Sequence, residues 1–269
     1  MTSTDQWNPD QYRRFQAERS RPFFDLLSLI ERDRVPLLGP RVVDLGCGPG
    51  ELTAEAHRQL DAHTTVGVDS SSAMLERAAE HASSRLTFEL GDIAEFPSAE
   101  AGSFDIVLAN ASLQWVPDHE AVLTRWAGAL TDDGQLAVQV PANVDHPSHV
   151  IAAEVASSPE FEAAFAPAGG PPGDTVHNVL LPEEYAELLD EIGFAQQHVR
   201  LQVYGHHLAS TSEVVEWVKG TSLTRFQRVL EPGDYERFLE VYRARLLEAL
   251  GDHSPFFYAF KRILMWARR

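Results

Sequence analysis

An apolar stretch that runs directly into a glycine-rich turn limits what this chain can fold into more than any other feature of its sequence. Residues 42–50 read VVDLGCGPG, and an amphipathic stretch follows from Glu51. In doubly wound α/β sheets, ligands bind outside the carboxyl ends of the strands, where glycines let the backbone approach them closely. The segment therefore predicts a strand, a turn and a helix, with a nucleotide-like cofactor beside Gly46, Gly48 and Gly50.

Short apolar runs alternate with amphipathic stretches over most of the chain, which is typical of βαβ units. Strands are expected at 41–45, 65–69, 86–90, 104–110, 135–140, 196–204 and 260–267. Helices are expected at 51–60, 72–82, 119–130 and 183–191, the last ending at Gly193. The pattern predicts an α/β fold with a seven-stranded, mostly parallel sheet and helices on both faces.

The remaining segments are expected to be helices and loops around this sheet. Two helices are predicted between residues 9 and 32, with Pro22 in the first turn of the second. Segment 143–182, rich in Pro, Ala and Gly, predicts a short helix and a loop. Ser210 and Glu213 match a capping box before helices that reach residue 250.

These elements suggest a single domain, residues 1–269, with functional subdivisions. We expect an N-terminal helical cap at 1–34 and a cofactor-binding core at 35–141. Two insertions, 142–182 and 205–255, are expected to form a lid over the acceptor.

The formal net charge of -18 argues against nucleic-acid and anionic-membrane partners, because binding either depends on basic patches. No run of about 18 apolar residues and no secretory signal pattern is present. The single cysteine, Cys47, cannot form an internal disulfide and fits a reducing compartment. We therefore expect a cytoplasmic protein that acts on a small molecule.

Three carboxylates at the ends of predicted strands favour a cationic, adenosine-containing cofactor. Asp44 precedes the glycines, where it suits an ammonium and a sulfonium better than a pyrophosphate. Asp69 can accept both hydrogens of a ribose diol, and Asp92 can accept from an adenine amino group while Ile93 packs on the ring. Two alternatives are a nicotinamide dehydrogenase, whose GxGxxG pattern would need a glycine where Glu51 stands, and a cofactor-binding protein without catalysis.

Residues 44–50, DLGCGPG, resemble the first motif of the class I S-adenosylmethionine methyltransferases. Stretches across nearly the whole chain are similar to the trans-aconitate 2-methyltransferases: WNP at 7–9, RSRP at 19–22, DSS at 69–71, ANASLQWVPDH at 109–119, LAVQVP at 136–141, PSH at 147–149, FKR at 260–262 and ARR at 267–269. The resemblance implies a Rossmann-like class I methyltransferase fold, S-adenosyl-L-methionine as cofactor and trans-aconitate or a related small polycarboxylic acid as acceptor. It gives cofactor contacts to Asp44, Gly46, Gly48, Gly50, Asp69, Ser70, Met74, Asp92, Ile93 and Asn110, the last beside the sulfonium.

A polycarboxylate acceptor requires cations, and arginine suits it because its planar fork pairs with a carboxylate through two hydrogen bonds. No Lys or Arg lies between Arg125 and Arg200. The candidates for acceptor binding are Arg19, Arg21, Arg228 and Arg262.

Two further residues are candidates for positioning the acceptor. Trp115 is interpreted as a wall that excludes water, with a core position as the alternative, and His149 as an acceptor contact. No metal is expected at His146 and His149, because Pro147 argues against a regular helix at that spacing. No general base is expected, since a carboxylic acid is already ionised at neutral pH; a hydroxyl or natural-product acceptor, the main alternative, would need one.

Overall fold

The computed structural model describes residues 16–96 and 102–269, with the side chains of 16–19 and 176 left aside. The chain forms two compact units. Of the described residues, the first unit holds 16–18, 143–177 and 203–260, and the second holds 19–96, 102–142, 178–202 and 261–269. The WNP stretch at 7–9 and the beginning of the first of the two expected N-terminal helices, before residue 16, lie outside the described residues.

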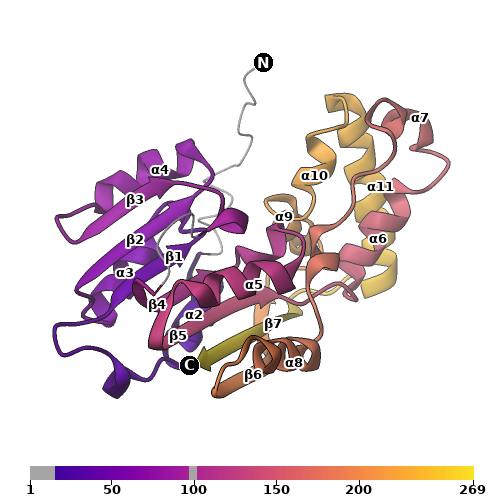
Figure 1. Cartoon of the computed structure of the whole chain (residues 1–269). Coiled ribbons are helices and arrows are strands. Elements are labelled where there is room, and N and C mark those ends of the chain that lie inside the picture. Colours follow the sequence, from indigo (N-terminus) through magenta and orange to yellow (C-terminus); the bar gives the residue numbers. More distant parts are fainter. Residues whose placement is uncertain (1–15, 97–101) are drawn as a thin grey trace. The chain divides into compact units, whose positions relative to one another are not determined.

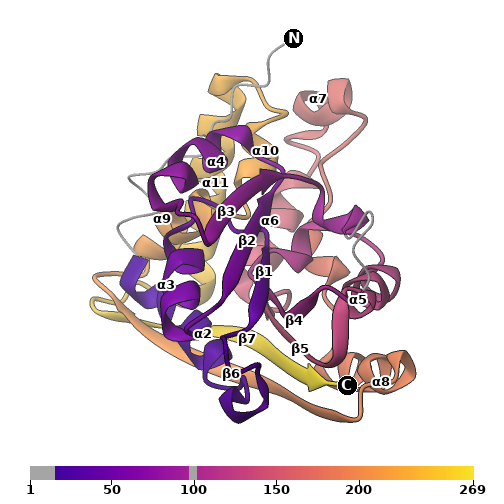
Figure 2. The ribbon, with the colours of Figure 1, turned by 60° about the vertical axis from the view of Figure 1, so that its left-hand side comes forward.

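A seven-stranded sheet dominates the second unit and confirms the predicted fold class (Figure 1). Its strands run in the order β3-β2-β1-β4-β5-β7-β6. Their bounds are β1 Arg41–Leu45, β2 Thr64–Asp69, β3 Leu86–Leu90, β4 Phe104–Asn110, β5 Leu130–Pro141, β6 Gln196–Leu208 and β7 Phe256–Arg268. The pairs from β3 to β5 are parallel, whereas β7 runs antiparallel to β5. Figure 2 shows β7 between β5 and β6.

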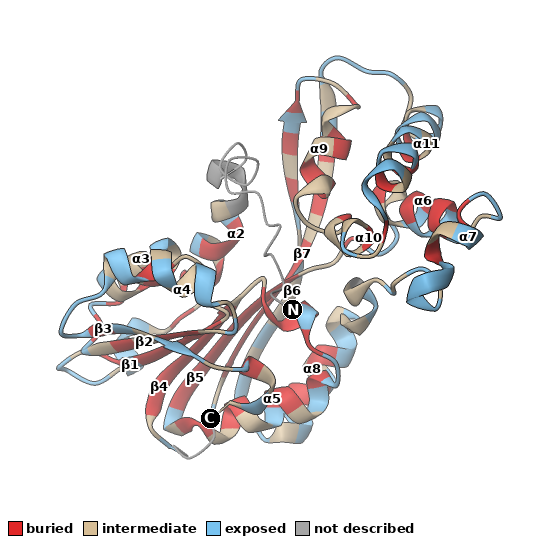
Figure 3. Cartoon of the chain, turned by 90° about the horizontal axis from the view of Figure 1, so that it is seen from above, coloured by how far each residue is buried: buried red, intermediate tan, exposed pale blue. Residues whose placement is uncertain are grey.

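The central strands are near-continuous apolar runs because both faces of the sheet are covered. Every residue of β4 except its last is buried, and the strands appear red through the middle of Figure 3. Figure 3 places α2 (Gln16–Leu27), α3 (Glu51–Gln59) and α4 (Ser72–Ala78) on one face, and α5 (His119–Gly128) and α8 (Pro182–Ile192) on the other. The carboxyl ends of β1 to β4 thus meet at one edge, where the glycine loop lies.

The predicted N-terminal arrangement needs correction at Pro22. We expected a new helix to begin there, but Pro22 lies inside α2. An interior proline costs a helix about 3 kcal/mol, whereas burying a large apolar side chain contributes about 1.5–3 kcal/mol. Phe23, Leu26 and Leu27 are all fully buried, so their burial outweighs the lost hydrogen bond.

Several element ends also differ from the sequence patterns. The three strands β5, β6 and β7 extend beyond the expected ranges, and the helix expected at 72–82 ends at Ala78 and continues as a short 3-10 turn. The capping box is wrong: α9 (Glu213–Lys219) has Ser212 as its N-cap, without a side-chain capping bond. The Ser210 hydroxyl lies 2.8 Å from the Ser212 hydroxyl instead.

The first unit is mainly helical, with its own apolar core that includes Phe161, Phe226 and Phe238. Besides α9 it contains α6 Pro147–Ala156, α7 Glu162–Phe165, α10 Thr224–Gln227 and α11 Pro232–Leu250. Segment 143–182 therefore holds more helix than expected. The prediction that Pro147 argues against a regular helix was wrong. Pro147 occupies the first turn of α6, where its missing N–H is not needed. Within the described ranges, no helix has the length and apolar character needed to cross a membrane.

Candidate active site

The glycine loop after β1 has a backbone that other residues could not adopt without strain. Gly46 and Gly48 have φ angles of 80° and 55°. A Cβ atom on Gly46 would lie 2.2 Å from the Cβ of Ser112, whereas one on Gly48 would meet nothing within 4 Å. The loop therefore packs closely on the protein at Gly46 and opens its backbone to a ligand at Gly48. Gly50 is the N-cap residue of α3 and also has a left-handed backbone.

Asp69 joins the end of β2 to this loop. One carboxylate oxygen accepts a hydrogen bond from Gly48 N at 2.8 Å, and the other accepts from Ser71 N at 2.9 Å. Each oxygen has a second lone pair, so the partly exposed carboxylate can still accept from a pair of hydroxyls. Ser70 is exposed next to it, and Met74 is half-buried on α4.

Asp44 is almost fully buried beneath the loop. Its Oδ2 accepts a hydrogen bond from the Thr53 hydroxyl at 2.6 Å. Burial raises the pKa of Asp44 to about 6, although the Thr53 hydrogen bond acts in the opposite direction and the charge of Asp69 adds to the rise. A carboxylate desolvated in this way is poised to pair with a cation, such as the ammonium of an amino acid moiety.

Cys47, in the middle of the loop, is not a nucleophile. It is buried, and this burial, together with the charges of Asp44 and Asp69, raises the pKa of its thiol far above the ordinary value. The thiol therefore stays protonated at neutral pH, while a nucleophilic cysteine needs the thiolate.

Asp92 and Ile93 follow β3 at the same edge of the sheet. Asp92 is exposed and caps a short 3-10 turn, where its Oδ1 accepts from Ala94 N at 2.9 Å. The Ile93 side chain is 9% exposed, and its carbonyl accepts from Trp126 Nε1 at 2.8 Å. The turn thus holds a carboxylate and an apolar side chain next to each other, as contacts to an adenine ring require.

Asn110 ends β4 and carries a buried oxygen, Oδ1, for which the described part of the chain offers no hydrogen-bond partner. Buried polar atoms are nearly always paired, so an unpaired one at a ligand-binding edge points to a missing ligand atom. Trp115, in the 3-10 turn after β4, is 54% exposed. That exposure excludes the alternative of a core aromatic and is consistent with a wall beside the site.

The ten cofactor candidates all lie in the second unit, at the carboxyl ends of β1 to β4. The acceptor candidates are divided between units. Arg21, exposed on α2, and Arg262, buried on β7, belong to the second unit with Trp115. His149 and the exposed Arg228 belong to the first unit. The Arg19 side chain is outside the described structure.

The sequence reasoning missed Arg225, which forms a largely buried cluster with Asp174 and His149 in the first unit. Asp174 makes an ion pair with Arg225 and lies 3.1 Å from His149 Nδ1. Burial acts to raise the pKa of Asp174, but the His149 hydrogen bond and the Arg225 charge outweigh it and hold that pKa well below its usual range. Of these three residues, the sequence had singled out His149 alone. Arg225 lies close in sequence to the candidate Arg228, but no local pattern linked it to Asp174.

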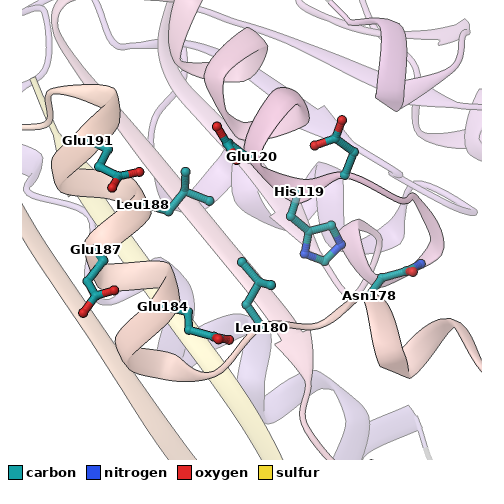
Figure 4. A pocket seen from close by; sticks show the side chains of 9 residues that line it. His119, Glu120, Asn178, Leu180, Glu184, Glu187, Leu188 and Glu191 are labelled. Carbon is teal, nitrogen blue, oxygen red and sulfur yellow. The ribbon is translucent and has the colours of Figure 1, made fainter.

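A hollow of about 400 Å³ between α5 and α8 is a poor acceptor site. Figure 4 shows Glu184, Glu187 and Glu191 of α8 along it, opposite Glu120 of α5. These carboxylates would repel a polycarboxylate. His119, at its edge, is engaged within the protein through the Tyr185 hydroxyl and two backbone carbonyls.

Comparisons with known proteins identify the family of the chain. A family model described as "Methyltransferase domain" matches residues 39–193, more than half of the chain. A trans-aconitate 2-methyltransferase of Deinococcus radiodurans is 43% identical over 98% of both chains, and one of Methylobacterium radiotolerans is 38% identical over the same shares. The chain belongs to the trans-aconitate 2-methyltransferase family.

Solved structures support the methyltransferase fold of this family member. The YcgJ protein of Bacillus subtilis matches with a TM-score of 0.59 at 16% identity, covering 91% of this chain and 98% of that one. A Haemonchus contortus phosphoethanolamine N-methyltransferase, solved with S-adenosylhomocysteine, matches with a TM-score of 0.56 at 18% identity, covering 98% of this chain and 59% of that one. The family model and the curated relatives set aside the dehydrogenase and the non-catalytic alternatives: the chain is a methyltransferase.

Proposed function

We propose that this methyltransferase uses S-adenosyl-L-methionine to esterify one carboxylate of trans-aconitate. The 43% identity to a trans-aconitate 2-methyltransferase over 98% of both chains is the observation that carries the proposal. The single cysteine is in keeping with a reducing compartment, so we propose the cytoplasm as the place of reaction.

The residues at the edge of the second unit fit the cofactor. Asp44 would face its ammonium, Asp69 its ribose hydroxyls, and Asp92 with Ile93 its adenine. The unpaired Asn110 Oδ1 would lie beside the sulfonium, whose attached methyl is electron-poor. The bound cofactor supplies that methyl group to an attacking oxygen by in-line displacement.

The protein's own contribution is to bind and orient, because the acceptor carboxylate is ionised at neutral pH and needs no base. Holding the reacting atoms about 3–3.5 Å apart and in line can supply roughly 7–11 kcal/mol of the barrier reduction. Trp115 would shield the reacting atoms from water. We propose Arg21 and Arg262 as the leading carboxylate contacts, since both lie in stretches that resemble the family.

The test combines binding with turnover. Calorimetry should show binding of S-adenosylhomocysteine and none of NAD. A screen with methyl-labelled S-adenosylmethionine should then show transfer to trans-aconitate in preference to citrate, cis-aconitate and isocitrate. Transfer to a hydroxyl compound but to none of these acids would refute the proposal.

A further inference from the structure

Two glutamines on β5 share one face of the sheet but have opposite hydrogen-bonding states. Gln135 is completely buried and both polar atoms of its amide are paired: Oε1 accepts from Glu31 N and Trp266 Nε1, and Nε2 donates to Glu31 O. Gln139 is 1% exposed, yet no acceptor in the described part of the chain pairs with its Nε2. The two positions are four residues apart, so they lie on the same side of the strand.

The register of the sheet places Gln139 at the site edge. Its Cα partner on β4 is Asn110, whose Oδ1 is the other unpaired amide atom described above. Although one atom is a donor and the other an acceptor, no hydrogen bond joins them in the structure. Both amides therefore point to atoms of a ligand.

A cation lies on the other side of Gln139. On β7, Leu264 is the Cα partner of Gln139 and Arg262 that of Pro141. Trp266 of β7 donates to Gln135, so the even-numbered residues of this part of β7 share the face of Gln139. Arg262, two residues from Leu264, is a diagonal neighbour of Gln139 on that face and is 9% exposed.

The hydrogen-bonding capacity of the amide side chains near Gln139 selects one kind of ligand group. The amide oxygens of Asn110 and Gln114 are unpaired acceptors, and the Gln114 Nε2 is occupied by Ala111 O at 2.7 Å. Among these three amides, the Gln139 nitrogen is the one that is buried without an acceptor in the described part of the chain. A buried donor beside an arginine, next to the residue proposed for the sulfonium, suits an anion close to the transferred methyl.

We propose that the Gln139 amide donates a hydrogen bond to the carboxylate of the acceptor that becomes methylated, and so sets the orientation of the attacking oxygen next to Asn110. This assignment rests on the proposed function. Gln139 takes no part in the bonds that form or break. Its role is to bind the acceptor carboxylate and to position the attacking oxygen.

The experiment compares Gln139→Met and Gln139→Glu with the wild type and with Gln135→Met as the matched control. Initial rates with trans-aconitate are measured at saturating S-adenosylmethionine between pH 6 and 8, with the dissociation constant of S-adenosylhomocysteine and the melting temperature as further readouts. Loss of one hydrogen bond to a charged group should raise the acceptor KM of Gln139→Met roughly 10- to 100-fold. Its S-adenosylhomocysteine affinity should stay within about threefold, and its melting temperature should not fall, because its donor has no protein partner.

Gln139→Glu gives a signature that a structural role would not produce. At pH 8 its carboxylate repels the acceptor, so kcat/KM should be lower than in Gln139→Met. As the pH falls towards 6, the buried carboxyl takes up a proton and can donate, so kcat/KM should rise. Gln139→Met should show no such rise. Gln135→Met should instead lose thermal stability and keep its acceptor KM.

Three results would overturn the inference: an acceptor KM within twofold of wild type in both Gln139 variants, an equal loss of affinity for acceptor and S-adenosylhomocysteine, or the same pH profile in the Glu and Met variants. If the wild type binds S-adenosylhomocysteine but transfers no methyl to trans-aconitate, the proposed function itself fails, and the inference fails with it. The three variant results leave methyl transfer by the wild type intact, so failure of the inference is distinguishable from failure of the proposed function.

Discussion

Asp44→Asn should make the cofactor-free protein more stable while weakening its binding of the cofactor. The wild-type carboxylate is buried with one hydrogen bond, from Thr53, and burial raises its pKa from 3.8 to about 6. The amide has nearly the same shape and no charge, and its oxygen can still accept from Thr53. The substitution therefore removes the cost of the buried charge with little change in packing.

The size of the effect follows from linkage between protonation and folding. One unit of difference between folded and unfolded pKa corresponds to 1.36 kcal/mol, and the pKa of Asp44 rises from 3.8 to about 6. Because the folded pKa is the higher one, ionisation destabilises the fold: the cost is absent well below pH 4 and complete above about pH 6. The expected gain for Asp44→Asn is about 3 kcal/mol at pH 7.5 and about 1 kcal/mol at pH 4.5.

Urea or thermal unfolding of both proteins at these two pH values measures the difference. For a chain of this size, 1 kcal/mol corresponds to roughly 2–4 °C in Tm, so the gain at pH 7.5 is about 6–12 °C. Asp105→Asn is the matched control, because Asp105 is also buried but accepts from Arg41 N at 2.8 Å and pairs with the Arg41 side chain. That variant should lose stability.

The same Asp44→Asn protein should bind S-adenosylhomocysteine at least tenfold more weakly, because the ammonium loses its opposite charge. A variant that is no more stable than wild type at pH 7.5, or whose gain does not depend on pH, would refute the reasoning on burial. Unchanged cofactor affinity would refute the pairing with the ammonium.

Three further predictions concern the rest of the site. Asp69→Ala should weaken S-adenosylhomocysteine binding by about 1.5–3 kcal/mol in calorimetry, as expected for lost hydrogen bonds to a charged group; an unchanged affinity would remove Asp69 from the ribose site. Asp174→Ala should lower the free energy of unfolding by about 3–5 kcal/mol because Arg225 is left buried without its counter-charge, whereas Asp234→Ala, in an exposed ion pair, should cost at most about 1 kcal/mol. Since the folded pKa of Asp174 is lowered, its deficit should be full at pH 7 and shrink below about pH 4; a deficit that is constant with pH would contradict the ion pair. The kcat for trans-aconitate should be nearly flat from about pH 6.5 to 9, and a loss below pH 7 that disappears in His149→Gln would mean that a base takes part.

Local patterns were sufficient for the elements that we propose to hold the cofactor. The apolar run before the glycines and the carboxylates at strand ends depend on neighbours within a few residues, and β1, β3 and β4 have the predicted bounds. Pro22 was misjudged because the burial of the apolar side chains that follow it outweighs the local preference of proline and keeps the helix continuous. Ser210 was misjudged because its hydroxyl lies against that of Ser212, which is the N-cap residue.

The sequence by itself determined the fold class and the family, and it predicted the edge proposed for the cofactor, since each rests on short motifs in a fixed order. Only the tertiary structure could distinguish Gln135 from Gln139, two identical residues in one strand. The hydrogen bonds of the Gln135 amide depend on Glu31, which is 104 residues away, and on Trp266, which is 131 residues away. The cluster of Asp174 with Arg225 and His149 likewise joins separate helices and a loop. Pairings at such separations leave no pattern along the chain, because the folded backbone, not the spacing of the residues, brings their polar atoms within hydrogen-bonding distance.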